Sequence, residues 1–307
     1  MMWAMCEPVQ RAEEDGQTMG EPLGSLFGRP RAEVEAAFPD RESVVCPICQ
    51  VEPRRFAVDF QGLSLARCPT CRLELHSPRP TLEQMARAVY GEHYHRADEA
   101  TADARHRRQY GRQVDRLEQL QPAGRRLLDV GCGAGAFLRF GRERGWDVEG
   151  TDYVLTPWAR ESGARVWEGE LPLVEFGGAR FDVVRFNHVL EHTRDPLSEL
   201  RAARSVLSPG GVLLIGVPNL AGASLRVKSW QSRLGLKGKR WRHYAALHHL
   251  WFFTPATLSR LVETAGFEVA HWETPVLALS RGPRLAYDRL VERLRTGGIL
   301  DLYARAV

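Results

Sequence analysis

The chain has 307 residues, which is long enough for one full α/β domain with a small additional unit. Its 42 Lys and Arg nearly balance 38 Asp and Glu, and a net charge of +4 is too small to imply nucleic-acid binding by itself. No basic patch followed by an apolar run opens the chain, and the longest apolar stretch, residues 212–223, contains Pro218 and Asn219. These features argue against a secretory signal and a membrane span, and they predict a cytoplasmic protein.

Cysteines dominate the first part of the chain. Four of them form two C-x-x-C pairs, namely Cys46, Cys49, Cys68 and Cys71. Two such pairs complete the tetrahedral thiolate shell that zinc prefers and leave no coordination position open, so the metal is expected to be structural. A reducing compartment weakens a disulfide interpretation, while iron and a redox dithiol stay open as alternatives. Residues 43–80 are therefore predicted to form a zinc ribbon.

The segments on either side of this ribbon have different patterns. Residues 1–42 are rich in Glu, Gly, Pro and Met without a clear period, which predicts disorder or loose attachment. Residues 81–122 are predicted to be a helical linker or cap. Within it, residues 98–120 have one apolar stripe at helical spacing, which we expect to pack on the following domain.

The most informative stretch is residues 127–137, which has the pattern of a buried strand, a glycine turn and a helix start. Gly131, Gly133 and Gly135 permit a tight turn and a close approach of a ligand to the backbone. Gly131, Gly133 and Ala136 also satisfy the dinucleotide fingerprint, so a nicotinamide or flavin enzyme is an alternative. Asp129 favours another ligand, because its carboxylate would repel a pyrophosphate and attract an ammonium group. S-adenosylmethionine carries an ammonium group and no phosphate.

Further polar residues are expected at the ends of later strands. A second strand, residues 147–152, ends at Asp152 and Tyr153, where the Asp152 carboxylate can accept hydrogen bonds from both ribose hydroxyls. Glu170 follows a third strand at 165–168, and Asn187 ends a fourth at 181–187. The alternation of strands with helices predicts a mostly parallel sheet with helices on both faces, so we expect these residues to border the cofactor.

His188, Glu191 and His192 follow the fourth strand and are the candidate catalytic residues. His192 could act as a general base with Glu191 nearby. A histidine that only packs the cleft wall is an equal alternative. The two histidines would share a face if this segment were helical, but no convincing third metal ligand follows nearby, so we expect them to line the cleft.

Between Leu200 and Val262 the chain has no Asp or Glu, although it has many Lys and Arg residues. Residues 219–251 form an insertion that mixes Trp230, Trp241, Tyr244 and Trp251 with the basic residues. Such a segment could cover an acceptor site and favour an anionic acceptor, and its aromatic rings could stack on a sugar or contact lipid. A solvated basic face is the plain alternative.

Residues 282–307 carry leucines among arginines and are predicted to form an amphipathic helical tail. Such a tail docks on the body of the protein, contacts a partner or touches a membrane surface. The sequence does not define the oligomeric state.

Several motifs together resemble the class I S-adenosylmethionine-dependent methyltransferases. Asp129, the glycine turn and Asp152 resemble the cofactor-binding motifs of that family. Residues 181–192 are similar to its fourth strand and the segment that follows, residues 207–215 to its fifth strand, and residues 258–269 to its penultimate helix and sixth strand. The resemblance implies a doubly wound, mostly parallel seven-stranded Rossmann-like sheet in residues 123–281.

The cysteine pairs and the residues after them also resemble a subgroup of this family with an amino-terminal zinc ribbon. Many of its members are associated with sugar, surface-polysaccharide or specialised-metabolite pathways. Arg72 stands where that subgroup usually has glycine, which affects the turn but not the four ligands. The resemblance implies methyl transfer from S-adenosylmethionine to a small-molecule or carrier-linked acceptor, with oxygen the favoured nucleophile.

Two functions from other classes stay open at this point. One is a zinc-ribbon RNA methyltransferase or nucleic-acid-binding modification protein, although the ribbon is only weakly basic between its cysteine pairs. The other is a scaffold that keeps the cofactor fold without turnover.

Overall fold

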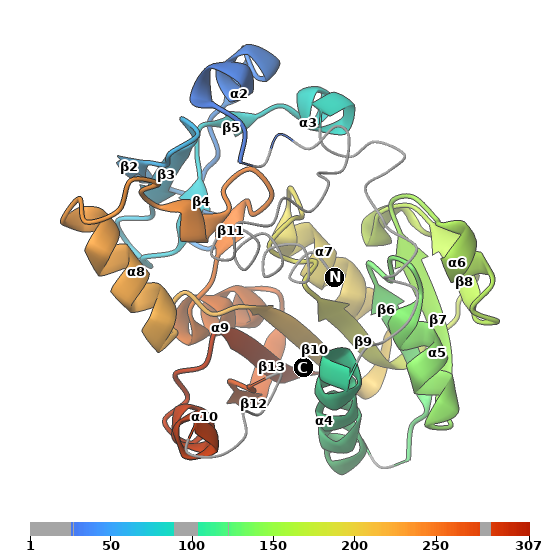
Figure 1. The fold of residues 1–307 in the computed structure, drawn as a ribbon. Coiled ribbons are helices and arrows are strands. Elements are labelled where there is room, and N and C mark those ends of the chain that lie inside the picture. The colour runs from blue at the N-terminus through green and yellow to red at the C-terminus, as the bar shows by residue number, and fades with distance from the viewer. Residues whose placement is uncertain (1–25, 27, 89–103, 122, 277–283) are drawn as a thin grey trace.

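The computed structural model describes residues 26, 28–88, 104–121, 123–276 and 284–307 (Figure 1). The helices are α2 Arg31–Ala37, α3 Leu82–Ala88, α4 Ala104–Leu120, α5 Ala136–Glu143, α6 Pro157–Arg160, α7 Pro196–Val206, α8 Ala223–Arg233, α9 Pro255–Thr264 and α10 Arg284–Arg293, with 3-10 turns η2 Leu171–Leu173 and η3 Arg242–Tyr244. The strands are β1 Arg41–Glu42, β2 Arg54–Val58, β3 Ser64–Arg67, β4 Glu74–His76, β5 Arg79–Pro80, β6 Arg126–Val130, β7 Asp147–Asp152, β8 Arg165–Glu168, β9 Phe181–Asn187, β10 Leu207–Pro218, β11 Trp251–Phe252, β12 Phe267–Glu273 and β13 Ile299–Ala306.

A seven-stranded sheet in the order β12-β13-β10-β9-β6-β7-β8 forms the centre of the molecule. The pairs from β10 through β8 are parallel, and β13 pairs antiparallel with both of its neighbours. This is the mostly parallel sheet that the sequence predicts. The crossovers place the carboxyl ends of β6, β7 and β9 at one edge, where ligands bind in sheets of this type.

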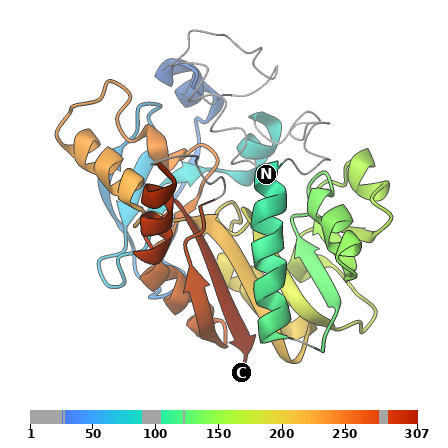
Figure 2. The ribbon, with the colours of Figure 1, turned by 60° about the horizontal axis from the view of Figure 1, so that its bottom comes forward.

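Alternating side chains of the sheet enter two separate cores. Leu127, Val212 and Tyr303 pack with α4 and α5 on one face, and α4 lies along this face in Figure 2. Leu128 and Leu213 pack with α7 and α9 on the other face. The apolar stripe predicted for residues 98–120 therefore packs on the sheet within α4, through Tyr110, Val114 and Leu117. Residues 89–103 and 122 of the predicted helical cap lie outside the described residues.

The predicted helical tail is wrong in its second half. Residues 284–293 form α10, but residues 299–306 form β13 between β12 and β10. Leu300, Leu302 and Ala304 are fully buried on one face and Tyr303 on the other, which is the two-residue period of a strand buried on both faces. The large sheet therefore continues beyond residue 281, where the sequence analysis ended it, to Ala306.

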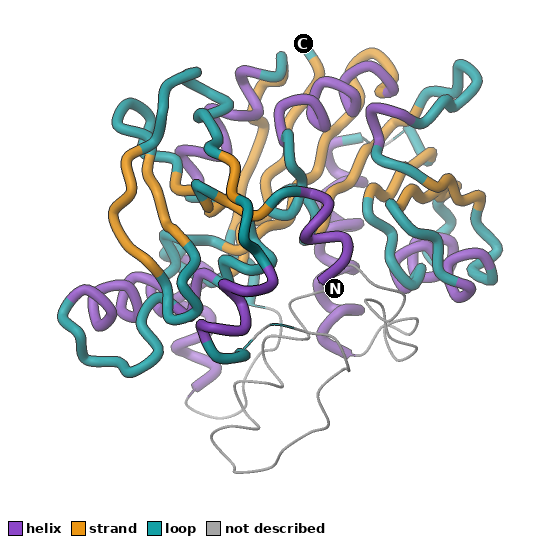
Figure 3. Tube along the Cα trace, turned by 90° about the horizontal axis from the view of Figure 1, so that it is seen from above, coloured by secondary structure: helices purple, strands orange, loops and turns teal. Residues whose placement is uncertain are grey.

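The ribbon forms a second, four-stranded sheet in the order β11-β4-β3-β2, which lies to one side of the large sheet (Figure 3). Its fourth strand, β11, comes from the end of the predicted insertion and pairs antiparallel with β4. The ribbon is thus not confined to residues 43–80, because its sheet is completed from the larger domain. Leu73, Leu75 and Trp251 join the same core as α7 and α9.

Part of the segment predicted to be disordered is ordered. Residues 1–25 and 27 lie outside the described residues, but α2 and β1 lie within 1–42. Val34 and Phe38 are buried against Leu63 and Leu65 of the ribbon, and β1 pairs with β5. Val34 and Phe38, together with hydrogen bonds from Gln61 to the carbonyls of Leu26 and Arg29, hold this segment on the ribbon.

Candidate functional site

The glycine turn lies between β6 and α5 and borders a small cavity. Gly131, Gly133 and Gly135 have φ angles of 69°, 55° and 78°, which L side chains rarely adopt. A Cβ on Gly131 would lie 2.3 Å from the side chain of Val189. The lining residues of the cavity are Tyr110, Asp129, Gly131, Cys132, Ala136, Phe137, Arg185 and Asn187. Three of the residues predicted to hold a cofactor, Asp129, Gly131 and Asn187, therefore meet here.

Asp129 forms a buried ion pair that the sequence analysis missed. Arg185 Nη1 donates to Asp129 Oδ1 at 2.6 Å, and each side chain is 3% exposed. Gln113 of α4 accepts from Nε and Nη2 of the same guanidinium at 3.1 and 3.0 Å. Burial raises the pKa of Asp129, and Arg185 opposes that rise. Arg185 lies between Val184 and Phe186 of β9, and a charged residue within this apolar run was the available signal.

Asp152 supports the turn from the end of β7. Its Oδ2 accepts from the backbone N–H of Gly133 at 2.7 Å. Tyr153, which follows, has an exposed side chain, and Glu170 is exposed at the start of η2. Neither of these two residues is among those that line the cavity.

The segment after β9 is a turn rather than a helix, so the two histidines there do not share a helical face. His188 has a φ of 57°, which is strained for a residue with a side chain, and its N–H donates to Gly216. His188 Nδ1 lies 3.4 Å and His192 Nε2 3.7 Å from Glu191 Oε1. The three predicted catalytic residues are therefore together, directly after the cavity residue Asn187.

His249 is a further member of this group, and it comes from the predicted insertion. Its ring centroid lies 4.9 Å from that of His192. One ligand atom each from Glu191, His192 and His249 lie within 4.8 Å of one another, so these residues could hold a metal ion. The third ligand that the sequence analysis did not find is distant in the chain. After η3 the chain returns to the segment that follows β9, and the N–H of Leu250 donates to the Glu191 carbonyl there. This return places His249 beside His192.

The polar atoms of this group are buried. Among the described residues, no hydrogen-bond partner is found for either carboxylate oxygen of Glu191 or for His192 Nε2. His192 Nδ1 lies 2.8 Å from the carbonyl oxygen of His248, so Nδ1 carries the proton and Nε2 is an acceptor. Burial lowers the pKa of His192 to about 4 and raises the pKa of Glu191. Burial also lowers the pKa of His188 well below its usual value and that of His249 to about 3.

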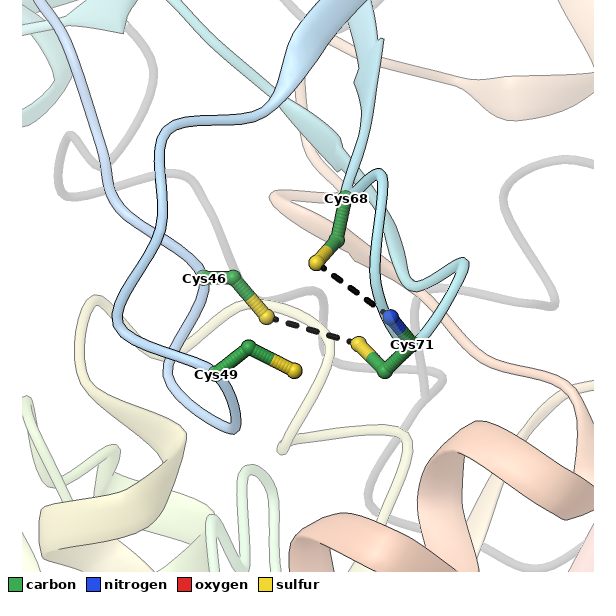
Figure 4. A group of neighbouring side chains, drawn as sticks. All are labelled: Cys46, Cys49, Cys68 and Cys71. Carbon is green, nitrogen blue, oxygen red and sulfur yellow. Dashed lines mark hydrogen bonds between the residues drawn. The ribbon is translucent and has the colours of Figure 1, made fainter.

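The four ribbon cysteines point toward one another (Figure 4). Their sulfur atoms all lie within 4.8 Å of one another, and Cys46 Sγ is 3.5 Å from Cys71 Sγ. These separations fit four thiolates on one tetrahedral ion, whose metal–sulfur bonds are about 2.3 Å in zinc sites.

Three of the aromatic residues predicted to cover an acceptor are instead core residues. Trp241, Tyr244 and Trp251 are buried, and the Tyr244 hydroxyl donates to Glu74 of the ribbon at 2.5 Å. Trp230 is the exception, with 58% of its surface exposed. Arg240 lies on a groove between the ribbon and the insertion, which Phe56, Asp59 and Phe60 also line.

A family model described as a methyltransferase domain matches residues 102–271, more than half of the chain. The chain therefore belongs to the S-adenosylmethionine-dependent methyltransferases of class I. It is 31% identical over 203 residues to a ubiquinone biosynthesis O-methyltransferase of Azorhizobium caulinodans, covering 62% of this chain and 77% of that protein. It is 33% identical over 165 residues to a protein of the same name from Xanthomonas axonopodis, covering 49% and 66%.

Solved structures with related folds include a Burkholderia thailandensis 1,6-didemethyltoxoflavin-N1-methyltransferase with bound S-adenosylhomocysteine. It is 21% identical, has a TM-score of 0.47, and the match covers 83% of this chain and 99% of that chain. A possible histamine N-methyltransferase of Thermotoga maritima is 18% identical with a TM-score of 0.46, covering 66% and 91%.

Proposed function

We propose that this enzyme transfers a methyl group from S-adenosylmethionine to an oxygen atom of a small-molecule or carrier-linked acceptor, with His192 as the general base. The observation that carries the proposal is the buried group of His188, Glu191 and His192 directly beside the cavity of the glycine turn. Two relatives are named as O-methyltransferases of ubiquinone biosynthesis, which supports oxygen as the acceptor atom and a small acceptor.

The cavity residues suit the methionyl end of the cofactor. Asp129 offers a carboxylate to the ammonium group, and Arg185 offers a guanidinium to the carboxylate. A guanidinium has five N–H donors, and the hydrogen bonds to Asp129 and Gln113 use three of them. We expect the Asp152 carboxylate, which contacts the Gly133 N–H, to accept hydrogen bonds from the ribose hydroxyls. A nicotinamide dinucleotide would instead bring a pyrophosphate close to Asp129.

S-adenosylmethionine supplies a methyl group that is already activated on a positively charged sulfur. The residues of this chain have to align the acceptor oxygen behind that methyl group and exclude water. His192 Nε2 takes the hydroxyl proton as the new oxygen–carbon bond forms and the sulfur–carbon bond breaks. The Glu191 carboxylate then stabilises the imidazolium, while the carbonyl of His248 keeps the proton on Nδ1.

The base can be tested by replacing His192 with Asn, which keeps a polar side chain of similar shape. Transfer of a labelled methyl group to a panel of hydroxylated acceptors should fall by about a hundredfold or more in kcat. The affinity for S-adenosylmethionine should not change. His271→Asn is the matched control, because His271 lies on β12 away from the cavity. Equal kcat in the wild type and His192→Asn would rule out the base.

We also infer that the basic insertion recognises an anionic acceptor, such as a phosphate-bearing or carboxylate-bearing molecule. Replacing its basic residues with Ala should raise the Michaelis constant of the acceptor at low salt without changing cofactor affinity. The residues are Lys237, Lys239, Arg240 and Arg242. An unchanged Michaelis constant for the acceptor would contradict this inference and would mean that the segment is a solvated basic face.

A structural zinc ion in the ribbon completes the proposal. The donor set of four thiolates leaves no position for a substrate, so the ion would fix the ribbon rather than take part in methyl transfer. The ribbon would in turn hold β11, and through it the segment that carries His249.

A further inference from the structure

Helix α8 exposes the side chains that an amphipathic helix normally buries. Val227 and Trp230 of α8 and Leu234 at its end are spaced i, i+3 and i+7, which places them on one helix face. They are 54%, 58% and 55% exposed, and Leu236 just beyond is 63% exposed. Within α8 itself, Ser232 is the buried residue. No other ten-residue stretch of the described chain exposes as many large apolar side chains.

The charged residues of α8 all have the same sign. Arg226 and Arg233 are exposed on the same helix, and the whole stretch from Leu200 to Val262 has no carboxylate. A protein partner of mixed charge would leave this run of cations without matching groups. The surface of a bilayer with anionic lipids supplies a continuous negative charge next to an apolar layer. Tryptophan is a side chain that prefers the boundary between headgroups and acyl chains.

A second exposed stripe lies nearby. Tyr287, Leu290 and Leu294 repeat the i, i+3, i+7 spacing on α10 and its end, and all three are at least half exposed. The chain after α10 is joined to the start of α8 by a hydrogen bond from the Ala223 N–H to the Thr296 carbonyl. The sequence analysis named contact with a membrane surface as one of three alternatives for the carboxyl-terminal tail. In the structure, the second half of that tail is strand β13 of the large sheet. Unlike α10, helix α8 combines exposed apolar side chains with charged residues that are all basic.

We propose that α8 binds peripherally to a membrane surface that contains anionic lipids, with Val227, Trp230 and Leu234 entering the interface and the arginines contacting headgroups. The helix would lie in the plane of the interface. The attachment is reversible, and among the described residues no helix is long and apolar enough to cross a membrane.

Cosedimentation with vesicles tests this. The wild-type chain should bind vesicles of phosphatidylglycerol and phosphatidylcholine in equal parts much more strongly than pure phosphatidylcholine, and added salt should weaken the binding. Val227→Ser/Trp230→Ser/Leu234→Ser should abolish it. Arg226→Gln/Arg233→Gln should weaken binding to the anionic vesicles by roughly 25-fold, at about fivefold for each charge. Leu173→Ser, an exposed leucine on η2, is the matched control and should bind like the wild type.

Because the replaced side chains are exposed, the melting temperature and the affinity for S-adenosylmethionine should be the same in all variants. Equal binding of the wild type and the triple variant to anionic vesicles, or no binding by the wild type, would overturn the proposal. So would a dimer in sedimentation equilibrium that the triple variant converts to a monomer, since the stripe would then be an interface between two copies.

Discussion

His76 of the ribbon should make the folded protein sensitive to acid. Its side chain is 1% exposed in β4, and burial, together with Arg41, Arg79 and Arg194, lowers its pKa from 6.5 to about 3. Between these two values the unfolded chain binds a proton that the native chain does not. The part of the stability that depends on neutral His76 is therefore fully present above about pH 6.5, falls as the pH drops below this value, and stops falling near pH 3.

The size of the effect follows from the two pKa values. Near pH 5 the unfolded state gains about 2 kcal/mol from protonating this one residue, relative to near pH 7.5. Urea unfolding of the wild type and His76→Gln at both pH values isolates the contribution of His76 to the free energy of unfolding, because every other titrating group is common to both proteins. The variant should lose about 2 kcal/mol less stability on acidification. An identical loss in both proteins would show that His76 is not held neutral in the folded state.

Three further outcomes are expected. Asp152→Asn should weaken S-adenosylmethionine binding by about ten- to a hundredfold in calorimetric titration, since charged hydrogen bonds to the ribose contribute about 1.5–3 kcal/mol. Glu168→Gln on the neighbouring strand should bind S-adenosylmethionine like the wild type. Equal affinities of the wild type and Asp152→Asn would show that Asp152 does not bind the cofactor. Cys49→Ser should reduce the zinc content from one ion per chain to none by elemental analysis, and zinc retained at one per chain would contradict four-thiolate binding. Leu302→Ala should cost about 2–5 kcal/mol in urea unfolding, and a loss well under 1 kcal/mol would argue against a central β13.

The sequence predicted the large sheet well where hydrophobic runs are bounded by turn residues. The bounds predicted for β6, β7 and β9 match the structure, and the residues at these strand ends, Gly131 after β6, Asp152 in β7 and Asn187 in β9, are not apolar. Strand β13 was missed because Asp301, Tyr303 and Arg305 interrupt its leucines and give the appearance of an amphipathic helix. In the fold, Asp301 is buried and accepts from Gln113, and burial raises its pKa to about 7. A carboxyl held this way cannot be recognised from local pattern.

In the candidate site, too, some residues could be predicted from the sequence and others could not. Residues close in sequence, such as His188, Glu191 and His192, could be grouped from their spacing. His249 and Arg185 could not, because their roles depend on a chain return through the ribbon and on the pairing of β9 with β6. The same return explains why Trp241, Tyr244 and Trp251 are core residues rather than acceptor contacts. Their burial depends on the ribbon sheet, which the insertion completes.

A crystal structure of the protein with S-adenosylhomocysteine tests the central claim most directly. The account predicts the homocysteine end in the cavity between Asp129, Arg185 and Asn187, the ribose hydroxyls at Asp152, and the sulfur facing the group of His188, Glu191 and His192. Density for the ligand elsewhere, or a sulfur turned away from His192, would contradict it.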